Sequence, residues 1–131
     1  GNVCVTGPKP DGSPWVVGIQ DPDGGQGYAE RLDITGGAVV TSGDYQRYYT
    51  VDGVTYHHII DPDTGAPARR YRSVTVLCPD SGLADALSTA VFTMDEAAGR
   101  DLLARYGAEA YWIYPDGSAV WTEGCEAYFH P

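Results

Sequence analysis

Two histidines stand side by side in residues 55–68, TYHHIIDPDTGAPA, and the chain holds only one more, His130. The second of the pair, His58, follows a β-rich run and precedes an Ile-Ile pair and the turn-forming Asp61-Pro62. A neutral imidazole placed where a strand gives way to a turn can serve as a general base or face a phosphate. The alternative is a hydrogen-bonded structural histidine beside an aspartate, Asp61, that simply caps the turn.

A carboxylate and a hydroxyl are spaced four residues apart in the run 80–94, DSGLADALSTAVFTM, whose pattern predicts a helix. At positions i and i+4, Asp85 and Thr89 lie one above the other, nearly opposite the apolar stripe. Such a pair can supply two hard oxygen ligands to Mg²⁺, which completes its shell with water and substrate phosphates. The spacing alone also fits a solvated polar face. The apolar stripe consists of Leu83, Leu87, Ala90, Val91 and Met94.

A third candidate site lies in the stretch TSGDYQRYY, residues 41–49. Ser42-Gly43 follows an apolar strand, where backbone amides can meet a phosphate. The guanidinium of Arg47 can pair with a phosphate as well. The alternatives are a strand-ending turn at Ser42 and an arginine that decorates an exposed strand face.

These candidates belong to a series of short strands and turns that later changes to helical periodicity. Several β-rich runs, then two short helices, then a closing hairpin predict an α+β fold with a mixed or antiparallel sheet. Asp52-Gly53 between two β-rich runs predicts a hairpin with a tight turn. The runs AERLDIT and GAVVTSG look like a strand pair around Gly36-Gly37. We expect residues 1–131 to fold as a single unit.

Capping residues mark the ends of both expected helices. Ser81 can cap the N-terminus of the first helix with its side-chain oxygen. Asp95 opens the second helix, which continues through EAAGRDLLARYG, and Gly107 is placed to end it.

Composition limits the functions that the chain can have. Of its 131 residues 43% are hydrophobic, and the formal net charge is −10. That charge argues against sequence-independent binding to nucleic acid and against an anionic membrane surface, both of which require Lys and Arg. No run approaches about 18 apolar residues, so no transmembrane helix is expected. The three cysteines form no CxxC pair, and Cys4 and Cys78 are expected to be small core residues.

The ordered motifs SGDYQRYY, HHIIDPDTGAPA, SVTVLCPD and ADALSTA together resemble those of the ApbE family. Members of this family are FAD:protein FMN transferases, once called thiamine biosynthesis lipoproteins. The resemblance covers nearly the whole chain. Its most specific part is His-x-Ile-Asp-Pro-x-Thr-Gly, starting at His58, followed by Ala-Asp-Ala-x-x-Thr around Asp85.

The resemblance implies a reaction and roles for the candidate residues. The family binds FAD and a divalent cation, usually Mg²⁺, and joins FMN to a Thr or Ser hydroxyl of a flavoprotein partner while AMP leaves. The metal ligands map onto Asp85 and Thr89. The family's histidine maps onto His58, facing the FAD phosphates or the incoming hydroxyl, whereas His57 is expected to be structural. Ser42 and Arg47 are the remaining candidates for cofactor binding.

The resemblance also implies that a large part of the enzyme lies elsewhere. Family members are roughly twice as long, and their first half carries flavin and adenine contacts, a Lys-Gly segment and a carbonyl ligand to the metal. This chain resembles the C-terminal half and begins inside a strand without Met, so we expect residues upstream, including any export signal or lipid anchor. The parent protein is expected to be extracytoplasmic and membrane-anchored. The isolated chain is expected to be inactive, and a homodimer is a candidate assembly for it.

Two alternatives of a different class remain open at this point. One is a non-catalytic flavin- or nucleotide-binding module, or an ApbE-like module that only hydrolyses FAD. The other is a structural fragment without a ligand, stable only as a dimer that covers its exposed surface.

Overall fold

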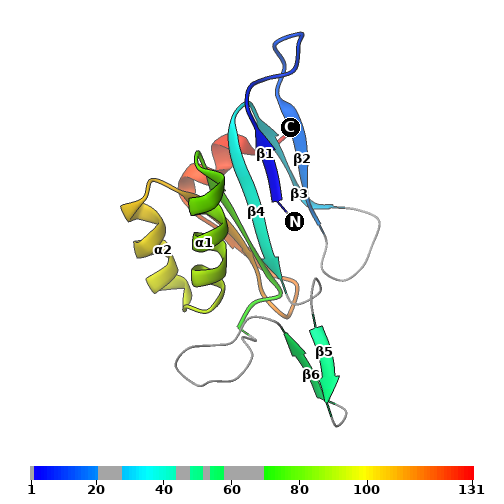
Figure 1. Cartoon of the computed structure of the whole chain (residues 1–131), viewed down its shortest axis with the longest axis vertical. Coiled ribbons are helices and arrows are strands. Elements are labelled where there is room, and N and C mark those ends of the chain that lie inside the picture. The colour runs from blue at the N-terminus through cyan, green and yellow to red at the C-terminus, as the bar shows by residue number, and fades with distance from the viewer. Residues whose placement is uncertain (1, 21–27, 44–47, 52–53, 58–69) are drawn as a thin grey trace.

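The computed structural model describes residues 2–20, 28–43, 48–51, 54–57 and 70–131. Within these residues the main body has three layers (Figure 1), with a five-stranded sheet between a pair of helices and a two-stranded hairpin. A second hairpin forms a small sheet of its own. The elements are β1 (Asn2–Val5), β2 (Trp15–Gln20), β3 (Tyr28–Ile34), β4 (Gly37–Gly43), β5 (Tyr48–Val51), β6 (Val54–His57), β7 (Ser73–Cys78), α1 (Ser81–Phe92), α2 (Glu96–Arg105), β8 (Glu109–Ile113), β9 (Ala119–Trp121) and the short 3₁₀ helix η1 (Glu123–Tyr128).

The central sheet has the strand order β1-β4-β7-β8-β9, and all of its neighbouring strands run antiparallel. This arrangement, with helices packed on one face, confirms the predicted α+β class. The predicted hairpin across Asp52-Gly53 is also present, since β5 pairs with β6 in antiparallel register.

One predicted pairing is wrong, because β3 and β4 do not pair with each other. β3 pairs with β2, Trp15 opposite Ile34, whereas β4 lies between β1 and β7 in the central sheet. The chain passes from one layer to the other at Gly37, which has φ +95°. A side chain there would press on the Cys78 carbonyl at 3.1 Å, so only glycine fits this crossing.

The central strand β7 contributes to two hydrophobic clusters, one on each face of the sheet. All six of its residues are buried, including the polar Ser73 and Thr75 that alternate with the valines of SVTVLC. Side chains alternate between the two faces of a strand. Val74 and Val76 therefore pack under the helices, while Leu77 packs under the β2–β3 hairpin.

The helix ends follow the predicted capping with one correction. Asp80, and not Ser81, caps α1: its backbone is extended and its carboxylate accepts a hydrogen bond from the Leu83 amide at 2.8 Å. Ser81 is already helical and therefore belongs to the first turn. The second helix begins and ends as predicted, with Asp95 capping the Ala98 amide and Gly107 at φ +66°. The Ala108 amide then bonds to the Leu103 carbonyl, which completes a glycine-based helix stop.

The cysteines divide differently from the prediction. Cys78 is buried as expected, and so is Cys125, whose thiol has its pKa raised to about 12, mainly by burial. The prediction for Cys4 is wrong, because this side chain is exposed. It belongs to β1, an edge strand of the central sheet, which pairs only with β4 among the described residues. None of the described helices is long and apolar enough to cross a membrane.

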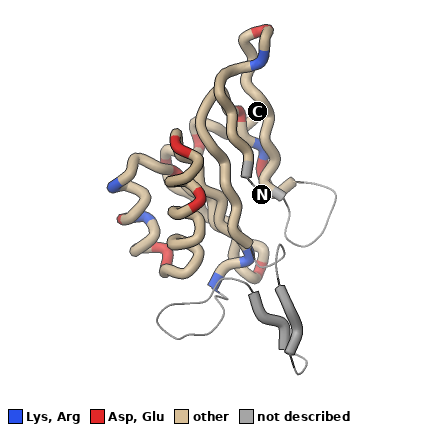
Figure 2. Tube along the Cα trace, viewed as in Figure 1, with Lys and Arg blue, Asp and Glu red and all other residues tan. Residues whose placement is uncertain are grey.

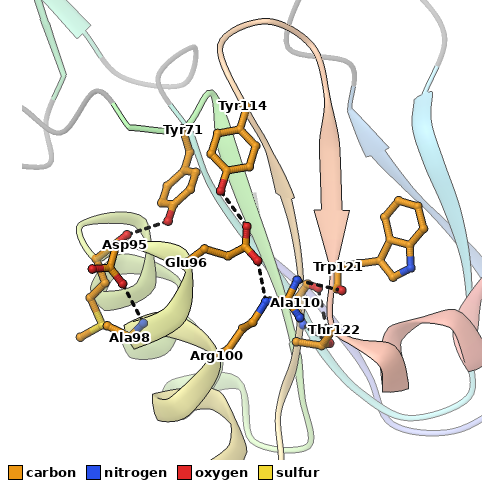
Figure 3. Close-up of polar contacts among 10 residues, drawn as sticks. Tyr71, Asp95, Glu96, Ala98, Arg100, Ala110, Tyr114, Trp121 and Thr122 are labelled. Carbon is orange, nitrogen blue, oxygen red and sulfur yellow. Dashed lines mark hydrogen bonds and ion pairs between the residues drawn. The ribbon is translucent and has the colours of Figure 1, made fainter.

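A polar network holds α2 against the C-terminal hairpin (Figure 3). Tyr114 donates to one oxygen of Glu96 at 2.8 Å, and Arg100 pairs with the other at 2.7 Å. The guanidinium of Arg100 also lies 5.1 Å from the ring centroid of Trp112. The hydrogen bond from Tyr114, followed by the bond from Arg100, lowers the pKa of Glu96.

This lowered pKa predicts a pH-dependent contribution to stability. A carboxyl with a depressed pKa stabilises the fold above its unfolded pKa, and this contribution is lost as pH falls through the folded value. Glu96→Gln should therefore lower the free energy of unfolding at pH 7 by less than about 1 kcal/mol, because a third of the side chain is exposed. Urea unfolding at pH 7 and pH 3 measures this, with the exposed Glu123→Gln as control. An equal loss at both pH values would contradict the assignment.

Candidate functional site

The predicted metal ligands lie on the solvent side of α1, in the part of that helix that turns away from the sheet. Asp85 and Thr89 are both exposed, whereas Ala84, Leu87, Ser88, Val91 and Phe92 are buried. Asp85 and Thr89 are one helical turn apart, so their side chains are neighbours on the helix surface. The two residues are thus exposed neighbours on one helix, as the spacing predicted, and their role as metal ligands stays a prediction.

The charge on α1 itself is compatible with a cation. This helix carries one acidic residue, Asp85, and no Lys or Arg (Figure 2), whereas α2 carries two acidic residues and two arginines. The chain as a whole carries a formal charge of −10. Among the described residues no three His, Cys, Asp or Glu side chains gather into a metal cluster. Asp85 and Thr89 therefore offer part of a coordination shell, to be completed by water, substrate or other protein groups.

The third candidate, Ser42, lies on the helix-facing side of β4 and is 8% exposed. Its hydroxyl is 3.0 Å from the hydroxyl of Ser88 on α1, and Ser88 donates to the carbonyl of Asp85 at 2.9 Å. Because a hydroxyl has a single proton, Ser42 must be the donor to Ser88. The side chain of Ser42 therefore contacts α1. The prediction that the Ser42-Gly43 amides bind a phosphate concerns the backbone and stays a prediction.

Sequence reasoning missed the role of Ser88. This residue lies three positions after Asp85 and faces the sheet, where it is fully buried. A lone serine on the buried side of an amphipathic helix is a signal, because a buried hydroxyl requires a hydrogen-bonding partner. The hydrogen bond between Ser88 and Ser42 links the helix that carries Asp85 and Thr89 directly to β4.

The Ser42–Ser88 pair predicts a measurable loss of stability. Ser88→Ala leaves the Ser42 hydroxyl buried without its acceptor, so the free energy of unfolding should fall by about 1–3 kcal/mol. Urea denaturation followed by circular dichroism measures the loss, and the exposed Ser81→Ala on the same helix is the matched control. The double variant Ser42→Ala/Ser88→Ala should lose less than the two single variants combined, because it leaves no orphaned hydroxyl. Unchanged stability of Ser88→Ala would contradict this.

Two predicted residues, Arg47 and His58, lie outside the described residues, so their roles stay predictions. After residue 69 the chain is fixed beside the C-terminal end of α1. Arg70 donates to the Thr93 carbonyl at 3.0 Å, and Tyr71 donates to the Met94 carbonyl at 2.7 Å. Burial is the main cause that raises the pKa of the Tyr71 hydroxyl, which therefore remains a donor at neutral pH.

The profile of the ApbE family matches residues 1–112 of the chain. The chain belongs to the ApbE family. Among curated ApbE relatives, the FAD:protein FMN transferase of Treponema pallidum is 47% identical over 105 residues, which are 78% of this chain and 29% of that protein. The protein of the same name from Escherichia coli K12 is 35% identical over 114 residues, 86% of this chain and 32% of that protein.

Solved ApbE structures share the fold described above. A crystal structure of an ApbE protein from Thermotoga maritima matches with a TM-score of 0.91 and 41% identity, and covers 100% of this chain and 43% of that one. The flavin transferase ApbE from Vibrio cholerae matches with a TM-score of 0.75 and 31% identity, over 98% of this chain and 42% of that one. The chain thus spans less than half the length of each of these ApbE relatives, and it corresponds to their C-terminal region.

Proposed function

We propose that this chain is part of a Mg²⁺-dependent FAD:protein FMN transferase, which joins FMN from FAD through a phosphoester to a Thr or Ser hydroxyl and releases AMP. The observation that carries the proposal is the 47% identity over 105 residues with the Treponema pallidum protein of that name. The geometry of α1 supports it, because Asp85 and Thr89 are exposed neighbours on this helix.

The exposed face of α1 fits a hard cation. A carboxylate and a hydroxyl are oxygen donors of the kind that Mg²⁺ takes from proteins, with water and substrate phosphates in its remaining positions. When bound, Mg²⁺ supplies neutralisation of the pyrophosphate charge. Asp85 would hold the ion mainly by its charge, and Thr89 would contribute a neutral oxygen.

The reaction moves one proton and exchanges one P–O bond for another. The acceptor hydroxyl attacks the phosphorus on the FMN side of the pyrophosphate, the bond to the AMP oxygen breaks, and AMP leaves with that electron pair. The hydroxyl proton passes to the neutral imidazole of His58 in its proposed role as general base. Arg47 and the amides of Ser42-Gly43 are proposed to hold the phosphates.

The proposal includes partners that these 131 residues do not contain. The acceptor is a flavoprotein that presents a Thr or Ser hydroxyl, and the rest of the parent polypeptide holds the flavin and adenine ends of FAD. The chain spans less than a third of the two curated relatives named above, which supports a site shared with the remaining polypeptide. The location that the resemblance implies for the parent protein, extracytoplasmic and membrane-anchored, belongs to the same proposal.

A graft tests the proposed activity of these residues. In the grafted protein, the 131 residues replace the segment that they match in the Thermotoga maritima ApbE protein, with which they share 41% identity. The grafted protein is expected to release AMP from FAD and to label an acceptor peptide with FMN when Mg²⁺ is present. AMP release without peptide labelling would favour the hydrolase alternative, and a folded graft that binds FAD without cleaving it would favour the binding module.

The isolated chain should be inactive in the same assay. Two ligands from one helix leave Mg²⁺ weakly bound unless substrate phosphates are held in place, and positioning of those phosphates requires the rest of the polypeptide. Titration of FAD with Mg²⁺ into the isolated chain should give no saturable binding at micromolar concentrations. Metal-dependent AMP release above background by the isolated chain would show that it forms a complete site.

A further inference from the structure

A groove of about 760 Å³ lies between β1 and β2. Among the described residues its lining comes from β1, the connection from β1 to β2, β2 itself and Tyr28, and these contribute no charged side chain. Small-molecule sites usually bring together several polar groups to orient a ligand. Here the lining side chains are almost all apolar, Thr6 being the exception apart from the weakly polar Cys4 and Tyr28. The groove is therefore better suited to polypeptide than to a nucleotide.

Most of the large exposed apolar side chains in the described residues line the groove. Four of the six large apolar side chains that are exposed in the described residues line it: Val3, Trp15, Val16 and Tyr28, which are 40%, 44%, 46% and 57% exposed. A contiguous exposed apolar patch on a protein usually marks an interaction surface.

Both strands that border the groove have an unpaired edge. In the described residues β1 pairs only with β4, and β2 pairs only with β3. Neither the sequence NVCV of β1 nor WVVGIQ of β2 contains a charged residue or a proline. Proteins usually protect exposed strand edges with such residues or cover them, so these two edges are suited to pairing with an added strand.

Two of the aromatic side chains that line the groove, Trp15 and Tyr28, are held in place by contacts within the chain. The indole nitrogen of Trp15 donates to the Gly7 carbonyl at 3.0 Å, and the ammonium of Lys9 lies 5.6 Å from the ring centroid of Trp15. On the other side, Tyr28 packs directly against the backbone of Gly18, where any added side chain would collide with its ring. Side chains fixed in this way cost less ordering entropy on binding.

We infer that this groove binds an extended, apolar segment of the family polypeptide that lies outside these 131 residues. This chain matches only 43% of the solved Thermotoga maritima chain. In that protein, more than half of the polypeptide therefore lies outside the region that has the fold described here. A second copy of this chain is the less favourable occupant, because each copy carries a formal charge of −10. The inference depends on family membership and does not depend on flavin transfer.

Cys4 reports directly on the groove. It lines the groove and is exposed, while Cys78 and Cys125 are buried. Maleimide labelling followed by peptide mapping should modify Cys4 rapidly in the dilute isolated chain. In the grafted protein the labelling rate should fall about tenfold or more, since thiol reactivity depends on access. A cysteine introduced by Ala104→Cys, on the exposed surface of α2, should label at the same rate in both proteins.

A substitution in the groove tests whether Cys4 is protected by a segment bound in the groove or by a general loss of access in the grafted protein. Val16→Lys places a charge in the lining and should restore labelling of Cys4 in the grafted protein, whereas Val16→Thr should not. If the graft does not fold, a cysteine at the aligned position of the Thermotoga maritima protein provides the same measurement, with Lys or Thr at the position aligned with Val16.

The labelling of Cys4 has three outcomes that decide between the inference and its alternatives. Equal labelling of Cys4 in the isolated chain and the grafted protein would overturn the inference, because the groove would be open in both. Protection that appears in the isolated chain as its concentration rises would overturn it in favour of a second copy. A grafted protein that protects Cys4 but transfers no FMN would leave the inference standing and contradict the proposed function.

Discussion

Asp85→Ala should lower metal-dependent FAD cleavage by the grafted protein about 100-fold or more at limiting Mg²⁺. Loss of a group that only supports a metal ligand commonly costs 10- to 100-fold, so loss of a charged ligand should cost at least as much. Asp85 is exposed, and its side chain has no hydrogen bond within the described residues, so the free energy of unfolding should change little. The assay is AMP release as a function of Mg²⁺ concentration, with circular dichroism to verify the fold.

Two further variants make this test specific. Asp101→Ala removes an exposed carboxylate from α2 and should retain full activity, which separates a ligand from general negative charge. Thr89→Ala should raise the Mg²⁺ requirement less than Asp85→Ala, because a neutral oxygen contributes less to cation binding than a carboxylate. Wild-type activity of Asp85→Ala at limiting Mg²⁺ would rule out the metal assignment.

His58→Ala should lower turnover of the grafted protein by about 10²–10⁴-fold, the range for loss of a general acid–base group. His57→Ala should cost far less, because the family's histidine corresponds to His58 and His57 is expected to be structural. The measurement is the rate of FMN transfer under saturating FAD and Mg²⁺.

The pH profile gives a second readout for the same variants. A general base must be neutral, so wild-type turnover should rise with pH through the titration of His58, and His58→Ala should lose this dependence. His57→Ala should keep it. If instead His57→Ala had the larger effect, the register carried over from the family would be wrong by one residue.

Most of the secondary structure could be predicted from sequence because its signals are local. The second helix begins after Asp95 and ends before Gly107 as predicted, since a helix cap depends on residues within one turn. Asp80 and Ser81 are both good N-cap types, and the sequence alone does not say at which residue the backbone becomes helical. That choice was therefore wrong by one residue.

The errors in tertiary structure have a different physical cause, because they concern residues distant in sequence. Strand pairing depends on which faces are buried, and Gly37 carries the chain between layers where two neighbouring strands look like a hairpin. Cysteine is a residue type that is usually buried, but Cys4 is exposed because its strand, β1, lies at the edge of the central sheet. Ser88 has a visible polar signal, yet its partner Ser42 is 46 positions away and no local pattern identifies it.

The complete burial of β7 has a consequence for the newly synthesised chain. Its two neighbours in the sheet are β4, which precedes it, and β8, which is separated from it by both helices. While residues 109–113 have not yet emerged from the ribosome, one edge of β7 has no partner and can pair with another nascent chain. The stage at which β7 has emerged and β8 has not would therefore expose an aggregation-prone intermediate, and chaperones that recognise extended apolar segments should associate with this protein during that interval.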